Sequence, residues 1–164
     1  MKTYFEKVWK IMPVFLTLLL VTTAGYAGTA QSMKGDMNGE MRMKSGAETM
    51  ISAEHMIIAS LEKQGLMENT AIVKGNSLLK AGEKSILKGK EMMKNAATRI
   101  KGKEMMMKGS TTMMEGKDDI MNALKKEGML ATKVLKPEEQ ELVNGENMML
   151  KGKSLMMDGE RMFE

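Results

Sequence analysis

A small residue at every seventh position is the feature that most constrains the fold of this chain. The series is Gly39, Gly46, Ala53, Ser60; Gly75, Gly82, Gly89, Ala96; Gly102, Gly109, Gly116, Ala123; and Gly145, Gly152, Gly159. Apolar residues follow each small residue after three to five places, and together they form one stripe along a helix. A strict period of seven indicates helices that coil around one another. We therefore predict an all-α fold of long antiparallel helices, a helical hairpin or a small bundle, with Gly/Met heptad seams.

The glycines of this series have a cost, because glycine in a helix interior is about 1 kcal/mol less favourable than alanine. One interpretation is that the small positions let two helix backbones approach closely. The other is that the chain forms short, fraying helical turns, each ended by its glycine. We favour the close-packed antiparallel helices.

Capping signals place the expected helices. Ser45 to Glu48 has the spacing of a capping box, Gly65 is a stop, and Pro137 followed by two acidic residues is typical of a helix start. We expect helices over 46–64, 67–127 and 137–163, with a break in the second near Ser110–Thr112. Residues 28–44 are predicted to be a flexible Met-rich segment, and residues 45–164 a helical repeat domain.

The first 27 residues have the order of a secretory signal. Lys2, Lys7 and Lys10 precede an apolar run over 11–21, and small residues follow up to Ala27. We predict a cleaved signal peptide over 1–27 and a periplasmic or secreted protein. The alternative is an uncleaved anchor over 8–30, because the uncharged stretch is long enough to span a bilayer of roughly 30 Å.

Charge and composition argue against two classes of function. Removing the three lysines and one glutamate of the signal lowers the net charge from the +4 of the whole chain to +2, and aromatic residues are 4% of the sequence. A nucleic-acid partner calls for a basic excess and stacking rings. The chain also has one histidine and no cysteine, and it contains no triad or phosphate loop. We therefore expect neither nucleic-acid binding nor enzyme activity.

Methionine is abundant, with 23 residues among 164. Its flexible thioether fills irregular cores, and it is also a soft ligand that suits Cu(I). The adjacent pairs Met92-Met93, Met113-Met114 and Met156-Met157 point about 100° apart on a helix, so neither member can clasp an ion with the other. We interpret these pairs as a packing seam.

The methionines before residue 44 differ, because no Leu, Ile or Val accompanies them between Ala30 and Thr49. A flexible segment could fold several thioethers around one Cu(I) or Ag(I) ion. His55 could add an imidazole ligand, and Met56 beside it a further thioether. The candidate metal ligands are Met33, Met37, Met41, Met43, His55 and Met56.

The export signal, the Met runs and Met41-Arg42-Met43 give the chain a loose resemblance to methionine-rich extracytoplasmic proteins that handle copper or silver. The resemblance implies soft-metal binding, although such proteins often carry many histidines and this chain does not.

Three functional hypotheses remain. The first is an exported buffer or chaperone for Cu(I) or Ag(I). The second is a structural or interaction protein whose Met-lined face contacts partner helices or a membrane surface. The third, weaker one is a sacrificial antioxidant. The pattern leaves open whether helices pair within one chain or in a homo-oligomer.

Overall fold

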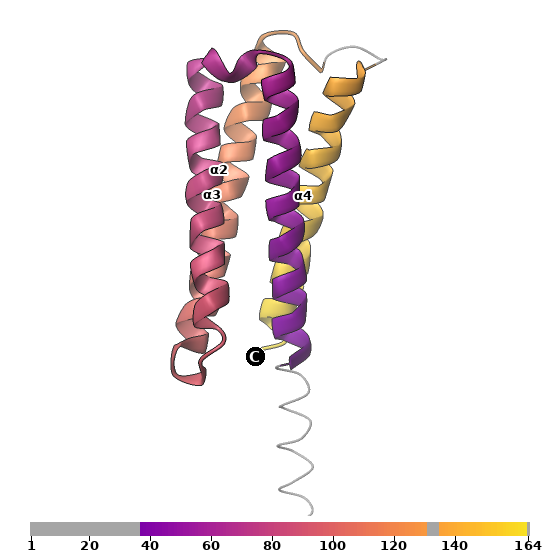
Figure 1. The fold of residues 1–164 in the computed structure, drawn as a ribbon. Coiled ribbons are helices and arrows are strands. Elements are labelled where there is room, and N and C mark those ends of the chain that lie inside the picture. The colour runs from indigo at the N-terminus through magenta and orange to yellow at the C-terminus, as the bar shows by residue number, and fades with distance from the viewer. Residues whose placement is uncertain (1–36, 131–134, 164) are drawn as a thin grey trace, which may run out of the picture. The chain divides into compact units, whose positions relative to one another are not determined.

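The computed structural model describes residues 37–130 and 135–163, and all regular structure in these ranges is helical. The N-terminal helix is described over residues 37–63, followed by α2 (Thr70–Met92), α3 (Arg99–Lys126) and α4 (Pro137–Arg161), as Figure 1 shows. Two single-turn 3₁₀ helices, Leu66–Glu68 and Ala96–Thr98, lie in the first two connections. The prediction of an all-α chain of long helices is confirmed.

The helix ends follow local chemistry. Gly65 ends the first helix region with a φ of 68°, a value that favours glycine. The Asn69 side chain accepts hydrogen bonds from the backbone N–H groups of Ala71 and Ile72 and so caps α2. Pro137 begins α4, and the Glu139 carboxylate accepts a hydrogen bond from the Lys136 N–H at 2.9 Å.

The predicted position of the break in the second helix was wrong. The chain turns at Met93–Thr98, where the Asn95 side chain caps the next turn by accepting from Ala97 N–H and the Thr98 hydroxyl donates to the Met92 carbonyl. Ser110 and Thr112 lie inside α3, where their hydroxyls donate to carbonyls of the preceding turn. Such local bonds leave the helix continuous.

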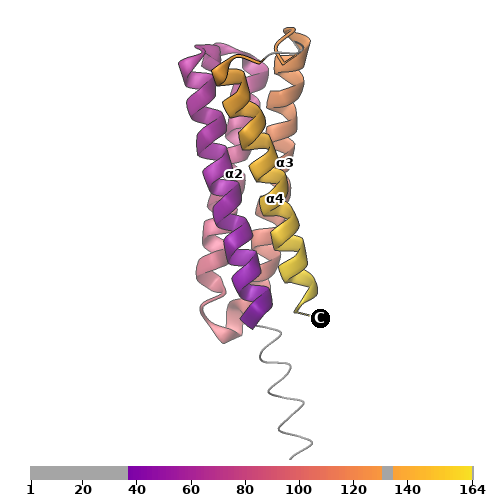
Figure 2. The same ribbon diagram turned by 90° about the vertical axis from the view of Figure 1, so that its right-hand side faces the viewer.

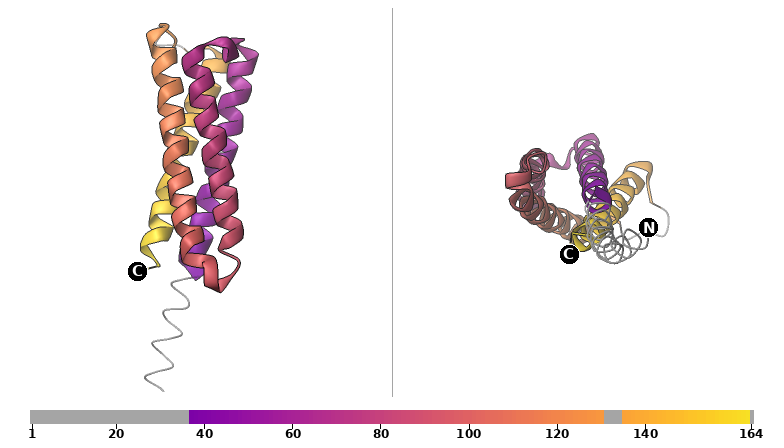
Figure 3. Two further views of the ribbon diagram at one scale, coloured as in Figure 1. Left: turned by 90° about the vertical axis from the view of Figure 1, so that its left-hand side faces the viewer. Right: turned by 90° about the horizontal axis from the view of Figure 1, so that it is seen from below.

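The helices associate as two antiparallel pairs (Figures 2 and 3). We call the N-terminal helix with α4 the first ribbon, and α2 with α3 the second ribbon. In the first ribbon Gly46 lies opposite Gly152, and in the second Gly82 lies opposite Gly109. The buried apolar residues of both ribbons form one continuous cluster.

The glycines mark where the backbones of each ribbon meet. A Cβ atom placed on Gly46 would lie 2.5 Å from the Gly152 carbonyl oxygen, and one on Gly89 would lie 2.5 Å from that of Gly102. Both distances are shorter than real Cβ contacts, so close approach explains these glycines. The interpretation as short turns ended by glycine is wrong, because α2 continues from Thr70 to Met92 through three of them.

Along most of the heptad series, the fourth residue after a small residue packs over a glycine of the partner helix. We call these positions the knobs; examples are Met106 above Gly89 and Met50 above Gly152. A small residue at position i and an apolar residue at i+4 therefore form the packing seam that the heptad pattern predicted.

The helix already includes residues 37–44, which were expected to be flexible. The reason is that Gly39 is the first residue of the heptad series and Met43 is its knob, packed against Gly159. The predicted signal peptide, the alternative anchor and residues 28–36 lie outside the described residues. Within the described part of the chain, no helix combines the length and apolar character needed to cross a bilayer.

Candidate functional site

Buried methionines gather at one end of the helices. In the N-terminal helix and α3, methionine comes first and Ile or Leu later, as in Met43, Met50, Ile57 and Leu61. In α2 and α4 the order is reversed. Because neighbouring helices are antiparallel, each reversal brings the methionines back to the same end of the fold. A drift of composition along the chain would not produce this alternation.

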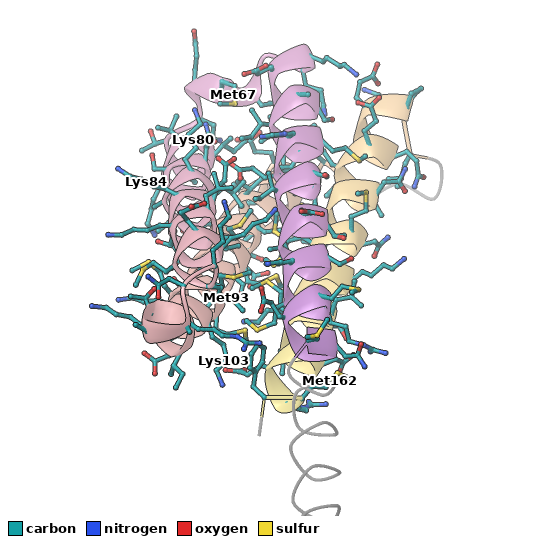
Figure 4. All side chains as sticks on the ribbon, turned by 60° about the horizontal axis from the view of Figure 1, so that its bottom comes forward. Met67, Lys80, Lys84, Met93, Lys103 and Met162 are labelled. Carbon is teal, nitrogen blue, oxygen red and sulfur yellow. The ribbon has the colours of Figure 1, made fainter. Side chains whose placement is uncertain are left out.

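We call this end, where α2 finishes and α3 begins, the methionine end, and the opposite one the aliphatic end. The methionine end lies at the bottom of Figure 1, and Figure 4 labels Met93, Lys103 and Met162 near it. Its buried knobs are at most 2% exposed: Met43, Met50, Met93, Met106, Met113, Met149 and Met156. The core toward the aliphatic end consists mainly of Ile57, Leu61, Ile72, Ile120, Leu124 and Leu142, with Met121 as an exception. Two aliphatic knobs of α2, Ile86 and Leu79, lie at the heights of Met106 and Met113, so the methionine end is rich in methionine without being made of it alone.

The thioethers of the methionine end come from both ribbons. Met43, Met50 and Met156 belong to the first ribbon, and Met106 and Met113 to the second. Each lies over a backbone hollow left by a glycine, with its Cγ atom 2.4–2.7 Å from the place a Cβ would take. A long, unbranched side chain fits such a hollow well, so the methionines are compatible with a packing role.

The structure separates the candidate ligands predicted from the sequence. Met33 lies outside the described residues, whereas Met37 and Met41 are 66% and 65% exposed. Met43 is fully buried, and the expectation that it has no core to join is wrong. Met41 and Met43 therefore do not face the same space.

His55 and Met56 also lie apart from the buried methionines of the knobs. The His55 side chain is 67% exposed, and its Nε2 is 3.8 Å from a Glu83 carboxylate oxygen across the gap between the ribbons. Met56 is partly buried. Among the described residues, no group of three His, Asp or Glu side chains is placed to hold a metal ion.

Sequence reasoning missed most members of the buried methionine cluster as candidate ligands. Met93, Met113 and Met156 were assigned to the seam, which is where they lie, but their shared end was not recognised. The signal was present in the alternating order of Met and Ile/Leu in successive helices, which becomes informative only when the helices are known to be antiparallel.

Ionisable side chains lie between the two ribbons. Glu54 is 1% exposed, and its Oε2 atom has no hydrogen-bond partner in the part of the chain that the structure describes. Burial raises the pKa of the Glu54 carboxyl to about 7; the Glu83 carboxylate adds to the rise and Lys80 opposes it. Burial likewise lowers the pKa of Lys153.

A buried lysine crosses the contact between α3 and α4. The Lys117 side chain is 6% exposed, pairs with Asp118 and lies 3.3 Å from Glu146. Lys153 of α4 donates to the Ser110 hydroxyl of α3 at 2.8 Å. Polar contacts of this kind link the ribbons beside the shared apolar cluster, whereas the backbones meet closely at glycines within each ribbon.

These features define an all-helical protein of two antiparallel, glycine-seamed ribbons with a thioether-rich end. Comparison of the chain with protein-family models, with curated proteins and with solved structures returns no match.

Proposed function

We propose that this protein binds a soft monovalent ion, Cu(I) or Ag(I), outside the cytoplasm as a buffer or chaperone. The observation that carries the proposal is the reversal of methionine order from helix to helix, which collects buried thioethers at one end of the fold. Thioethers are neutral, soft ligands, and Cu(I) prefers soft ligands. The chain has no cysteine to serve instead.

Packing alone gives a weaker reason for the segregation. A methionine core specifies a unique packing less well than one of leucine or isoleucine, since the side chain has more freedom. The aliphatic end of the same bundle fills equivalent knobs with Ile57 and Ile120. The glycine seam therefore accepts branched aliphatic residues, and the choice of methionine at the other end favours a chemical role.

The test is a Cu(I) titration of the mature chain under anaerobic, reducing conditions against a competing chelator. The variant Met43→Leu/Met50→Leu/Met106→Leu/Met113→Leu replaces thioethers with a side chain of similar volume, a change that usually costs under about 1.5 kcal/mol per site. We expect it to lose most of the bound copper. Unchanged stoichiometry in this variant, or wild-type binding weaker than millimolar, would overturn the proposal.

Two further variants separate the candidate ligand sets. Met33→Leu/Met37→Leu/Met41→Leu tests the N-terminal segment, in which two of the three thioethers are exposed. His55→Ala/Met56→Leu tests the second pair. Met157→Leu is the matched control, because Met157 is 39% exposed and is not a knob. We expect the control to bind as the wild type does.

A structural or interaction role is the second candidate. It is favoured by Met41, Ile100 and Met162, which expose 65%, 73% and 38% of their surfaces at the methionine end. Such side chains suit a partner helix, a second copy or a membrane surface. Two results would favour this role over metal binding. The circular dichroism spectrum would not change when Cu(I) is added, and the protein would co-sediment with lipid vesicles or elute as an oligomer.

A further inference from the structure

One arginine joins the two ribbons at the methionine end. Arg99, at the start of α3, lies 3.1 Å from a Glu40 carboxylate oxygen in the N-terminal helix. Its guanidinium carbon is also 5.2 Å from the centre of the Phe163 ring, just beyond α4. Lys103, one turn further along α3, lies 5.4 Å from the same ring. Arg99 of the second ribbon therefore contacts residues from both helical segments of the first ribbon, Glu40 in the N-terminal helix and Phe163 just after α4.

The Phe163 ring lies at the methionine end, between the N-terminal helix and the start of α3. Its Cδ2 atom is 3.2 Å from the position a Cβ would take on Gly39, so the ring packs against the N-terminal helix as well as beneath the α3 cations. Phe163 is partly buried against the hydrophobic cluster that contains the knobs. It is the one aromatic ring in the part of the chain that the structure describes.

The contacts within and between the ribbons differ in kind. Within a ribbon, backbones meet at glycines and the knobs are fully buried, so separation would expose a large apolar area. Between ribbons, partly exposed ion pairs such as Lys90–Glu48 at 2.5 Å and Arg99–Glu40 at 3.1 Å recur beside the shared apolar cluster. Such ion pairs and cation–π contacts each contribute little. Because the glycine contacts between backbones lie within the ribbons, we expect the fold to open between the ribbons rather than within one.

We propose that the ribbons part at the methionine end to admit a soft ion, and that Arg99, held between Glu40 and Phe163, is the latch that controls this opening. The inference rests on the proposed function for the identity of the ion. The latch itself is a property of the metal-free fold. The side chains of Glu40 and Arg99 are 21% and 29% exposed. Partial burial strengthens their ion pair, while solvent can still reach it.

The first test needs no metal and uses the absence of native cysteine. Met106→Cys places one thiol at the methionine end, and Ile120→Cys places one at a fully buried knob of the aliphatic end. Met50→Cys is a second probe at the methionine end should the first variant fold poorly. The rate at which a soluble disulfide reagent labels each thiol reports how often that end opens.

The latch is weakened by Glu40→Gln/Phe163→Leu, which keeps side-chain size while removing the charge and the ring. Lys63→Gln is the matched control, because it breaks an ion pair with Glu141 within the first ribbon, 2.9 Å long and at the aliphatic end. The variant loses the Arg99–Glu40 pair and the cation–π contacts of Arg99 and Lys103 between the ribbons, together with the Glu40–Lys44 pair within one helix. The losses between the ribbons should raise opening about tenfold or more. We expect that increase at Met106→Cys in the latch variant only.

Two results would overturn the latch. One is an unchanged labelling rate at Met106→Cys. The other is an equal rise at Ile120→Cys, which would mean that the whole bundle unfolds. In a separate stopped-flow experiment, Ag(I) should associate about tenfold faster with the latch variant, at the same final stoichiometry. A wild-type chain that binds no Ag(I) would refute the metal function, while the labelling rates would still decide the latch.

Discussion

The replacement Gly152→Ala tests whether close backbone approach holds each ribbon together. An added Cβ would lie 2.6 Å from the Gly46 carbonyl oxygen and 2.9 Å from the Met50 nitrogen. Because both are backbone atoms of the partner helix, no side-chain rotation relieves the clash. The helices must separate by roughly 0.8 Å to restore ordinary contact at 3.4 Å, and overpacking of this kind typically costs about 1–3 kcal/mol.

The expected sign is the opposite of the intrinsic preference. Alanine is favoured over glycine within a helix by about 1 kcal/mol, and this gain offsets part of the clash. The separation also loosens the knobs Met50 and Met156 on either side of the site. We therefore expect a net loss of about 2 kcal/mol, or about 8 °C in Tm at roughly 4 °C for each kcal/mol.

Gly145→Ala is the matched control in the same helix. There the nearest backbone atom, the Ala53 carbonyl oxygen, is 3.3 Å from the new Cβ, and the short contact of 2.6 Å is with a side-chain atom of Ile57. The cost should be clearly smaller than at Gly152. Thermal unfolding followed by circular dichroism at 222 nm measures both. A Tm for Gly152→Ala at or above that of the wild type would refute the glycine-contact reasoning.

Two further predictions concern the polar groups between the ribbons. The pKa of the Glu54 carboxyl is raised from its ordinary value of 4.5 to about 7, so the folded state favours the protonated form. The stabilising effect of this proton is full below about pH 4.5 and is lost as the pH rises through 7. The Tm of the wild type should fall over this window more than that of Glu54→Gln, and parallel pH profiles would contradict the assignment. Lys117→Ala should lower the free energy of unfolding in urea by about 2 kcal/mol, because it removes a side chain that is 6% exposed together with its bond to the partly buried Glu146. Lys74→Ala, whose side chain is 72% exposed in its pair with Asp119, should change it by at most about 0.5 kcal/mol; equal effects would argue against a structural role for burial of Lys117.

The fold was predictable from the sequence because its main determinant is periodic. The spacing of Gly75, Gly82 and Gly89 specifies which face of the helix meets a partner, and Pro137 marks the start of α4. The turn at Met93–Thr98 was missed because Asn95 and Thr98 act through single capping bonds, which have no periodic signal. The one-residue slip between Gly75 and Gly102, four heptads less one, was the available clue to its position.

The candidate site was less predictable, because burial depends on which helices pair. Met43 has no aliphatic neighbour in sequence, yet it packs on Gly159, more than a hundred residues away. Met41, two residues before it, is exposed. Local composition therefore grouped two methionines that the helix places on different faces, and it left out Met50 and Met106.

The glycine seam and the methionine cluster have a common physical basis. A glycine removes the side chain that would fill the space between two backbones, and a residue from the partner helix must enter that space. At Gly75 and Gly145 a β-branched isoleucine does so, through Ile120 and Ile57. Since the same hollow accepts a stiff side chain there, the methionines at the opposite end are not imposed by geometry. We propose that these thioethers serve metal binding, and the Met→Leu variants test this because they keep the packing of the hollow and remove the sulfur.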